Sequence, residues 1–306
     1  MKAVVLEKFG SINNLTYKEV PAPVPPPGTV LIKTAYAAVN PYDRKIIEIF
    51  GNEMGVKVPV IPGSELSGTV TAVGEGVTQL KEGDAVFGTL STFGGCFAEL
   101  VVAKATDLVK KPEALSFETA AATPVAALTA RKVLFETAHL QSGQKVLIHG
   151  ASGNVGAMAV QLAKLAGAYV IATGSGKNES RIKKLGADEF IDYTRQDFSV
   201  IVKDVDVVLD TIGGKTQEAS FKVIKQGGWL VSIVQPPSEA EASRYQVHAT
   251  IIYSGPDTEQ LSNIARQIVN GDLKVNVEKV YPLNEAIKAV NAVKEGHRTG
   301  KILLKP

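Results

Sequence analysis

The chain has 306 residues, 45% of them apolar, and a formal net charge of +2. That much apolar sequence can fill one or two ordinary cores, so two domains are expected. The small charge and the 6% aromatic content argue against a surface built to bind nucleic acid. No apolar run comes near the length of a membrane span, and the chain starts directly with a β-type run. We therefore expect a soluble, cytoplasmic protein without a nucleic-acid or membrane partner.

Residues 1 to about 120 are rich in short β-type runs and glycine turns. The proline-rich segment at 21–28 joins the first two runs as an extended surface connection. The later runs alternate with glycine-containing turns and show no β-α-β rhythm. Short strands at such close spacing predict a small barrel. The runs are Lys2 to Leu6, Thr29 to Ala37, Gly68 to Val73, Gly83 to Phe87 and Ala98 to Val102.

The character of the sequence changes at Ser116. An alanine-rich helix is expected to follow, with Ser116 as its N-cap and Glu118 as the acid in its first turn. A second helical run extends from Val125 to Phe135.

The segment Lys145 to Thr173 has the pattern of a dinucleotide-binding unit. An apolar run ends at His149, a glycine turn follows, and a helix with one apolar face leads to a second β-type run. In such units the pyrophosphate lies at the N-terminus of the helix. The turn reads A-x-G-x-x-G, one methyl group away from the usual fingerprint. The predicted cofactor contacts in this turn are Ala151, Ser152, Gly153, Asn154, Val155 and Gly156.

The end of the second run indicates which nucleotide binds. Enzymes that prefer NAD place a carboxylate there, which binds the ribose 2′-hydroxyl. From Thr173 onward this sequence has no carboxylate until Glu179, and it offers Ser175, Lys177 and Arg181 to a 2′-phosphate. NADPH is therefore the expected cofactor, and Thr173 belongs to the candidate set. In the alternative interpretation, Lys177 and Arg181 are solvated charges at the start of a surface helix.

Strands and helices continue to alternate after this unit, which predicts a doubly wound parallel sheet. The expected strands are Glu189 to Asp192, Val205 to Asp210 and Gly228 to Val234, and the expected helices lie near Glu179 to Leu185 and Thr216 to Ile224. Beyond the sheet we expect a strand at Tyr245 to Tyr253, helices at Thr258 to Val269 and Leu283 to Val293, and a final strand at Lys301 to Leu304.

Together these motifs resemble the zinc-independent quinone oxidoreductases of the medium-chain dehydrogenase/reductase superfamily, and the resemblance covers essentially the whole chain. It implies an α/β fold with a GroES-like β-barrel domain at 1–122 and 272–306 and a Rossmann domain at 123–271 that binds NADPH. It also implies a homodimer whose sheets join through the strand at Tyr245 to Tyr253. The matching motifs are Val39-Asn40-Pro41-Tyr42-Asp43, Pro62 to Gly68, Gly83-Asp84-Ala85-Val86, Leu128-Thr129-Ala130, Gly150 to Gly156 and Gly300-Lys301.

The resemblance also bears on metal binding. Alcohol dehydrogenase relatives bind catalytic zinc through a Cys, a His and a second Cys or similar ligand, whereas the matching places here carry Asn40, Ser64 and the Thr123-Pro124 stretch. Neutral oxygen ligands suit zinc poorly, and Cys96 is the only cysteine. No metal is expected. The four histidines lack ligand spacing and are expected at the surface or at helix ends: His139, His149, His248 and His297.

Without zinc, the acceptor must take hydride readily, as quinones and α,β-unsaturated carbonyls do. The site then needs a hydrogen-bond donor near the acceptor oxygen, and a proton source. Asn40, in the N-P-x-D motif, is the expected donor, with Tyr42 and Lys45 as further donors, while Asp43 is expected to be structural. The alternative for Asn40 is a local role in an Asn-Pro turn.

Other cofactor contacts rest mainly on the resemblance. Thr129 would hold the nicotinamide carboxamide, and Tyr193 would lie beside the adenosine. Ile212 lies at the C-terminal end of a strand, where cofactor loops gather, and Ile233 and Val234, at the corresponding place in a later strand, would lie against the nicotinamide. The alternative for Thr129 is a bond to its own helix backbone, and the alternative for Tyr193 is packing.

The leading hypothesis is an NADPH-dependent quinone oxidoreductase. An NADPH-dependent enone reductase would share every cofactor residue. A third possibility is an NADPH-binding protein with a structural or regulatory role and little turnover, although the small net charge disfavours RNA binding.

Overall fold

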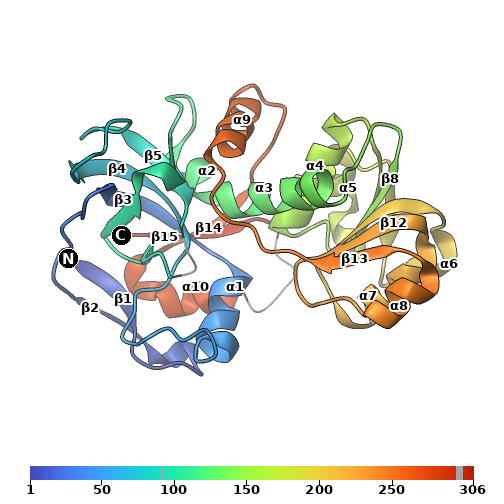
Figure 1. The fold of residues 1–306 in the computed structure, drawn as a ribbon, viewed down its shortest axis with the longest axis horizontal. Helices are drawn as coiled ribbons and strands as arrows, with labels where there is room; N and C mark the ends of the chain where they lie inside the picture. The colour runs from blue at the N-terminus through green and yellow to red at the C-terminus, as the bar shows by residue number, and fades with distance from the viewer. Residues whose placement is uncertain (91–92, 294–298) are drawn as a thin grey trace. The chain divides into compact units, whose positions relative to one another are not determined.

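The computed structural model describes residues 1–90, 93–293 and 299–306. The chain forms two compact units, Met1–Val125 with Gly255–Pro306, and Ala126–Ser254 (Figure 1). Because the chain returns to the first unit at Gly255, the helix at Thr258–Val269, which we expected in the nucleotide-binding domain, belongs to the first unit. His297 lies outside the described residues. Within those residues, no helix is long and apolar enough to cross a membrane.

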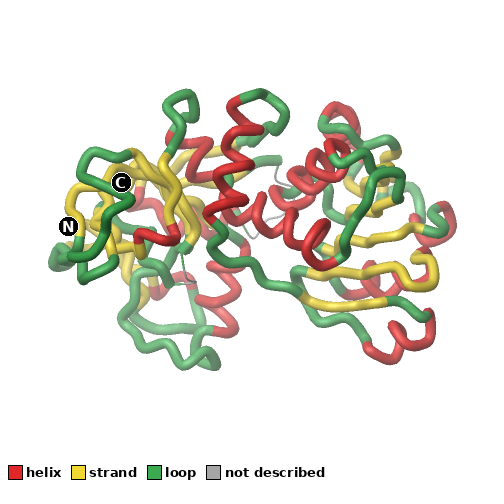
Figure 2. Tube along the Cα trace, turned by 45° about the horizontal axis from the view of Figure 1, so that its top comes forward, coloured by secondary structure: helices red, strands yellow, loops and turns green. Residues whose placement is uncertain are grey.

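The first unit is built on a mostly antiparallel sheet with the strand order β14-β15-β3-β4-β5-β7, and β6 also pairs with β3. A separate hairpin is formed by β1 and β2, and Figure 2 shows how strands and loops dominate this unit. The strands are β1 (Lys2–Leu6), β2 (Leu15–Glu19), β3 (Thr29–Val39), β4 (Glu65–Val73), β5 (Ala85–Thr89), β6 (Leu100–Lys104), β7 (Leu108–Lys110), β14 (Val277–Pro282) and β15 (Lys301–Lys305). The helices are α1 (Pro41–Lys45), α2 (Phe117–Ala122), α9 (Thr258–Val269) and α10 (Ala286–Ala292), and α3 (Pro124–Arg131) contains the crossing to the second unit.

Strand β3 organises the first unit. One of its edges pairs with β6 over Thr29 to Lys33 and with β15 over Ala37 to Val39, and the other edge pairs with β4. Val30 and Ile32 are fully buried in a core that also contains apolar residues of β1, β4 and α10. This pairing places the residue that follows β3 beside the start of β15. Ser116 caps α2 as predicted, because its hydroxyl accepts the backbone N–H of Thr119.

The second unit is a six-stranded parallel sheet with the order β10-β9-β8-β11-β12-β13. Helices α4 and α5 lie on one side of it and α7 and α8 on the other (Figure 1). The strands are β8 (Lys145–Ile148), β9 (Tyr169–Gly174), β10 (Glu189–Asp192), β11 (Val205–Asp210), β12 (Ile224–Ser232) and β13 (His248–Ile251). The helices are α4 (Asn154–Leu165), α5 (Glu179–Lys184), α6 (Phe198–Ile201), α7 (Gly214–Ser220) and α8 (Glu239–Tyr245). The predicted doubly wound Rossmann arrangement is confirmed.

Several predicted boundaries were wrong. The strand expected at Tyr245 to Tyr253 is only His248–Ile251, because Tyr245 is the last residue of α8. The strand expected from Gly228 begins at Ile224, and the helix expected near Thr216 to Ile224 is Gly214–Ser220. The helical run from Val125 to Phe135 divides into α3 and a wider π-helical segment at Lys132–Thr137.

Candidate functional site

The glycine turn after β8 forms a cradle of backbone N–H groups at the start of α4 in the second unit. A Cβ on Gly156 would collide with the carbonyl oxygen of Gly150, so only glycine lets α4 start this close to the strand. Gly153 is the N-cap of α4 and has no side chain to bond the first N–H groups of the helix. Those N–H groups have no intrahelical partner, so they fit the phosphates of a dinucleotide.

The turn after β9 lies beside this cradle. Arg181 of α5 donates from Nη2 to the carbonyl oxygen of Ser152 at 2.7 Å, which joins α5 to the glycine turn. Ser175 accepts a hydrogen bond from the Asn178 amide at 3.0 Å, and Lys177 is exposed. Three residues predicted to bind a 2′-phosphate are therefore placed around one turn: Ser175, Lys177 and Arg181.

The fold brings a carboxylate to this turn that the sequence analysis missed. Asp192 ends β10, and a Cβ on Gly176 would lie 2.5 Å from its Oδ2. Asp192 also accepts hydrogen bonds from the backbone and the hydroxyl of Thr194, and these bonds, first of all that from the hydroxyl, lower the pKa of its carboxyl. The sequence signal is the Ile-Asp-Tyr run, in which the resemblance pointed to Tyr193 and not to its neighbour Asp192. Tyr193 itself is 53% exposed.

His149 is not at the surface or at a helix end, which corrects our expectation. It is 1% exposed at the end of β8, and both ring nitrogens are bonded: Nδ1 to the Thr173 hydroxyl at 3.1 Å and Nε2 to the Ser220 hydroxyl at 3.0 Å. Ser220 donates its own hydrogen to Thr216, so it accepts from Nε2–H and Thr173 donates to Nδ1. Burial lowers the pKa of His149 to about 4, so the ring is neutral near pH 7. The predicted contact Thr173 is thus engaged with His149.

Asp210 fixes the loop after β11. Its carboxylate is fully buried and accepts the backbone N–H groups of Ile212 and Gly213 and the hydroxyl of Ser232. The predicted contacts of this edge remain accessible: Ile212 is 56% exposed, and Ile233 and Val234, after β12, are half-buried. The loops after β8, β9, β10, β11 and β12 therefore gather at the carboxyl edge of the sheet, where cofactors bind in such folds.

Thr129 lies on α3 and bonds outside its own helix. Its hydroxyl lies 2.6 Å from the hydroxyl of Ser254, the residue that ends the second unit. A second bond joins the same two segments: Lys132 donates to the carbonyl oxygen of Tyr253 at 2.9 Å.

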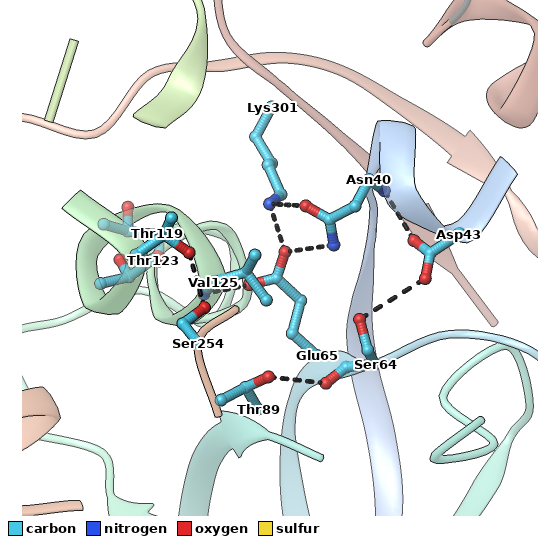
Figure 3. Close-up of polar contacts among 11 residues, drawn as sticks. Asn40, Asp43, Ser64, Glu65, Thr89, Thr119, Thr123, Val125, Ser254 and Lys301 are labelled. Atoms are coloured by element: carbon cyan, nitrogen blue, oxygen red, sulfur yellow. Dashed lines mark hydrogen bonds and ion pairs between the residues drawn. The ribbon is translucent and has the colours of Figure 1, made fainter. Parts of the chain in front are cut away.

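The first unit contains a buried polar cluster at the end of β3, made of Asn40, Asp43, Ser64, Glu65 and Lys301 (Figure 3). We refer to it as the Asn40 cluster. The amide of Asn40 donates from Nδ2 to Glu65 Oε1 at 2.9 Å and accepts at Oδ1 from Lys301 Nζ at 2.7 Å. Lys301 and Glu65 also form an ion pair, and Glu65 Oε2 accepts the backbone N–H of Val125 at 2.9 Å.

Asp43 has the structural role that we expected. Its Oδ2 accepts the backbone N–H of Asn40 at 2.7 Å, and Oδ1 lies 3.5 Å from the donating hydroxyl of Ser64. Burial raises the pKa of Asp43 to about 7. Of the other predicted donors, Tyr42 is 38% exposed in the first turn of α1 and Lys45 is half-buried at its end.

The side chains at the places that hold zinc in alcohol dehydrogenases do not fit a zinc ion. Asn40 is occupied by Lys301 and Glu65, Ser64 donates to Asp43, and Thr123 donates to the carbonyl oxygen of Thr119 at 2.6 Å. Zinc sites in proteins use His nitrogen, Cys sulfur or carboxylate oxygen. In residues 1–90, 93–293 and 299–306, no group of three or more His, Cys, Asp and Glu side chains is placed to hold a metal ion.

Comparisons with known proteins match the whole chain. Residues 26–113 match the alcohol dehydrogenase GroES-like domain, and residues 185–304 match a family described as zinc-binding dehydrogenase. The chain is 33% identical to a chloroplast envelope quinone oxidoreductase homolog of Arabidopsis thaliana, over 97% of this chain and 95% of that protein. It is 30% identical to an NADPH-dependent alkenal/one oxidoreductase of the same plant, over 100% and 80%. The structure of Escherichia coli quinone oxidoreductase complexed with NADPH superposes with a TM-score of 0.92, at 27% identity and 100% coverage of both chains.

Proposed function

The chain belongs to the quinone oxidoreductase-like members of the medium-chain dehydrogenase/reductase superfamily, and we propose that it uses NADPH to reduce quinones without a zinc ion. The observation that carries this proposal is the Asn40 cluster. It offers an oriented amide in a buried setting, and its side chains are unsuited to zinc. Such a site can stabilise developing negative charge by hydrogen bonding alone.

This chemistry suits an acceptor that needs no Lewis acid. When bound, the nicotinamide cofactor supplies hydride, that is, two electrons and one hydrogen. A quinone that takes hydride becomes a hydroquinone monoanion, whose charge is spread over ring and oxygen, and one proton completes the hydroquinone. Asn40 would donate its remaining amide hydrogen to the acceptor oxygen, with Tyr42 and Lys45 as further donors and water as the proton source.

The second unit would hold the cofactor. The N-terminus of α4, capped only by Gly153, would bind the pyrophosphate. Asp210 would keep the loop of Ile212 in place, while Ile233 and Val234 would supply apolar contact and Thr129 would bind the carboxamide.

The preference for NADPH over NADH rests on the turn after β9. Ser175, Lys177 and Arg181 surround this turn, and Tyr193 would flank the adenosine. Asp192 is a carboxylate near the same turn, but it is engaged with Thr194 and packed against Gly176. We propose that Asp192 shapes the turn and that Lys177 contributes the charge that attracts the 2′-phosphate.

An enone is the second candidate acceptor, because one matched relative is named an alkenal/one oxidoreductase. Hydride would then add to the β-carbon, and the resulting enolate would be protonated at the α-carbon. The same donor, Asn40, would serve the enolate oxygen.

We also propose a homodimer formed by two β13 strands, since β13 is the last strand at one edge of the parallel sheet. A solution mass of one chain at micromolar concentration would contradict this. A cytoplasmic location is proposed as well, although the two matched Arabidopsis relatives carry chloroplast names.

An acceptor panel tests the proposed function. NADPH oxidation would be followed with 1,4-benzoquinone, 9,10-phenanthrenequinone and a simple enone, with NADH in parallel. The proposal predicts quinone turnover that is faster with NADPH. Turnover of the enone alone would favour the second candidate, and no turnover of any acceptor would refute both.

A further inference from the structure

Lys301 reaches Asn40 from the opposite end of the chain. It is the first residue of β15, and β15 pairs with β3 so that Ile302 lies opposite Val39, the residue before Asn40. The sheet therefore delivers the lysine ammonium to the asparagine amide. Lys301 is 1% exposed and Glu65 is fully buried, so both charges are removed from water.

The two charges together allow only one orientation of the Asn40 amide. Its oxygen faces Lys301, which can only donate, and its nitrogen faces Glu65 Oε1, which accepts. A flipped amide would place its oxygen against the carboxylate and its NH₂ group against the ammonium. Both contacts would be repulsive, and because Lys301 and Glu65 are buried, water would not screen the repulsion.

In the part of the chain that the structure describes, these bonds leave one amide hydrogen of Asn40 available. Nδ2 carries two hydrogens and gives one to Glu65. The cation bonded at Oδ1 withdraws electrons from the amide, which makes the remaining N–H a stronger donor. An uncharged side chain at 301 could fill the same space but could neither fix nor polarise the amide.

We propose that Lys301 is a positioning residue, which acts through Asn40 by fixing its amide and strengthening the N–H that faces the acceptor oxygen. This inference rests on the proposed reduction of a quinone or an enone. Lys301 does not touch the acceptor itself, so its effect must vanish when the Asn40 amide is absent.

A double-mutant cycle tests this dependence. Lys301→Met should lower kcat with 9,10-phenanthrenequinone about tenfold or more, with KM for NADPH changed less than about twofold. Lys301→Arg should restore much of the loss because it keeps the cation. In an Asn40→Ala background, Lys301→Met should change kcat by less than about twofold. A full Lys301→Met effect in that background would overturn the proposal.

Two further variants test whether a loss of kcat in Lys301→Met comes from misfolding. Lys305→Met removes an exposed lysine from the same strand and should leave kcat unchanged. If Lys301→Met does not fold, Lys301→Met combined with Glu65→Gln removes both buried charges, and it should fold but show the same low kcat. Wild-type kcat in this neutral pair would refute a role for the cation.

A spectroscopic readout separates this inference from the proposed function. In protein labelled with ¹⁵N-asparagine, the Asn40 side-chain pair is assigned by its loss in Asn40→Ala. These two amide signals should shift or broaden in Lys301→Met and in the double variant Lys301→Met with Glu65→Gln. They should not change in Lys305→Met. An unchanged pair would overturn the positioning role, even if the wild type reduced no acceptor, and that absence of turnover would refute only the proposed function.

Discussion

The carboxylate of Asp43 accepts the backbone N–H of Asn40 at 2.7 Å, and the two residues are only 3% and 7% exposed. This contact fixes the first turn of α1 at the point where β3 ends. Burial raises the pKa of Asp43 to about 7, so the carboxyl carries a proton in the folded state at a pH where the unfolded chain has lost it.

Asp43 by itself should make the free energy of unfolding fall as the pH rises from about 4 to about 7, because its folded carboxyl keeps a proton that the unfolded chain has lost. Buried His149 acts in the opposite direction: its pKa falls from 6.5 to about 4 on folding, so it makes stability rise over most of the same window, and the two effects nearly cancel in the wild type. Asp43→Asn keeps an acceptor for Asn40 and removes only the falling contribution, so the stability of this variant should rise with pH from about 4 to about 6.5. Urea unfolding across the pH range measures the two profiles.

Asp197→Asn is the control for this titration. Hydrogen bonds from Ser199, first of all from its hydroxyl, lower the pKa of Asp197, so Asp197→Asn should leave the wild-type profile between about pH 4 and about 7 unchanged in shape. Equal slopes for wild type and Asp43→Asn would show that Asp43 does not titrate in this window.

Breaking the ion pair of Glu65 and Lys301 should lower the free energy of unfolding substantially. Glu65→Ala leaves an ammonium group buried without its counter-charge, which typically costs about 3–5 kcal/mol of unfolding free energy. Glu19→Ala is the matched control, because its pair with Lys2 is exposed and is worth at most about 1 kcal/mol. Chemical denaturation of both variants measures the difference, and losses of the same size would argue against an intact buried pair.

Gly153→Ala should separate cofactor binding from folding. A Cβ there would meet only the Gly150 carbonyl, at an ordinary 3.4 Å, so the variant should keep the melting temperature of the wild type. Its methyl group would occupy the space where phosphates approach α4, and we expect Kd for NADPH to rise at least about tenfold, roughly 1.4 kcal/mol.

The control for this substitution is Gly255→Ala, where a Cβ would enter open space. It should leave Kd and melting temperature unchanged. Unchanged NADPH affinity in Gly153→Ala, measured by cofactor fluorescence titration, would place the pyrophosphate elsewhere.

Lys177→Ala should reduce the preference for NADPH. The proposed partner of the exposed ammonium is the 2′-phosphate, which NADPH has and NADH lacks, so we expect roughly tenfold weaker NADPH binding and unchanged NADH binding. Lys184→Ala, which removes another exposed charge at the end of α5, should change neither affinity. An equal loss of affinity for both cofactors would show that Lys177 does not distinguish NADPH from NADH through the 2′-phosphate.

Patterned segments were predictable from the sequence. The strand Lys2–Leu6 and the helix Thr258–Val269 have the predicted bounds. The strand is a short continuous apolar run after Lys2, and the helix combines a helical apolar period with Asp257 as its N-cap. The glycine turn was predictable from its A-x-G-x-x-G spacing between a strand and a helix. Strand β14 was missed because most of its residues are exposed and show no alternation.

The Asn40 cluster and the burial of His149 were not predictable in this way. Charged residues such as Lys301 and Glu65 are usually exposed, and only the pairing of β15 with β3 brings the lysine to Asn40. His149 reads as a polar residue beside a glycine turn, while its partners Thr173 and Ser220 come from β9 and α7. Side chains that form hydrogen bonds or ion pairs with residues of distant helices and strands leave no local pattern in the sequence.

The most direct test of the central claim is single-turnover oxidation of enzyme-bound NADPH by 9,10-phenanthrenequinone, after prolonged treatment of the enzyme with a chelator. We expect rapid loss of NADPH absorbance with one hydroquinone formed per NADPH, at the rate of the untreated enzyme and faster than with NADH. No quinone-dependent oxidation, or a rate that depends on restored zinc, would contradict it.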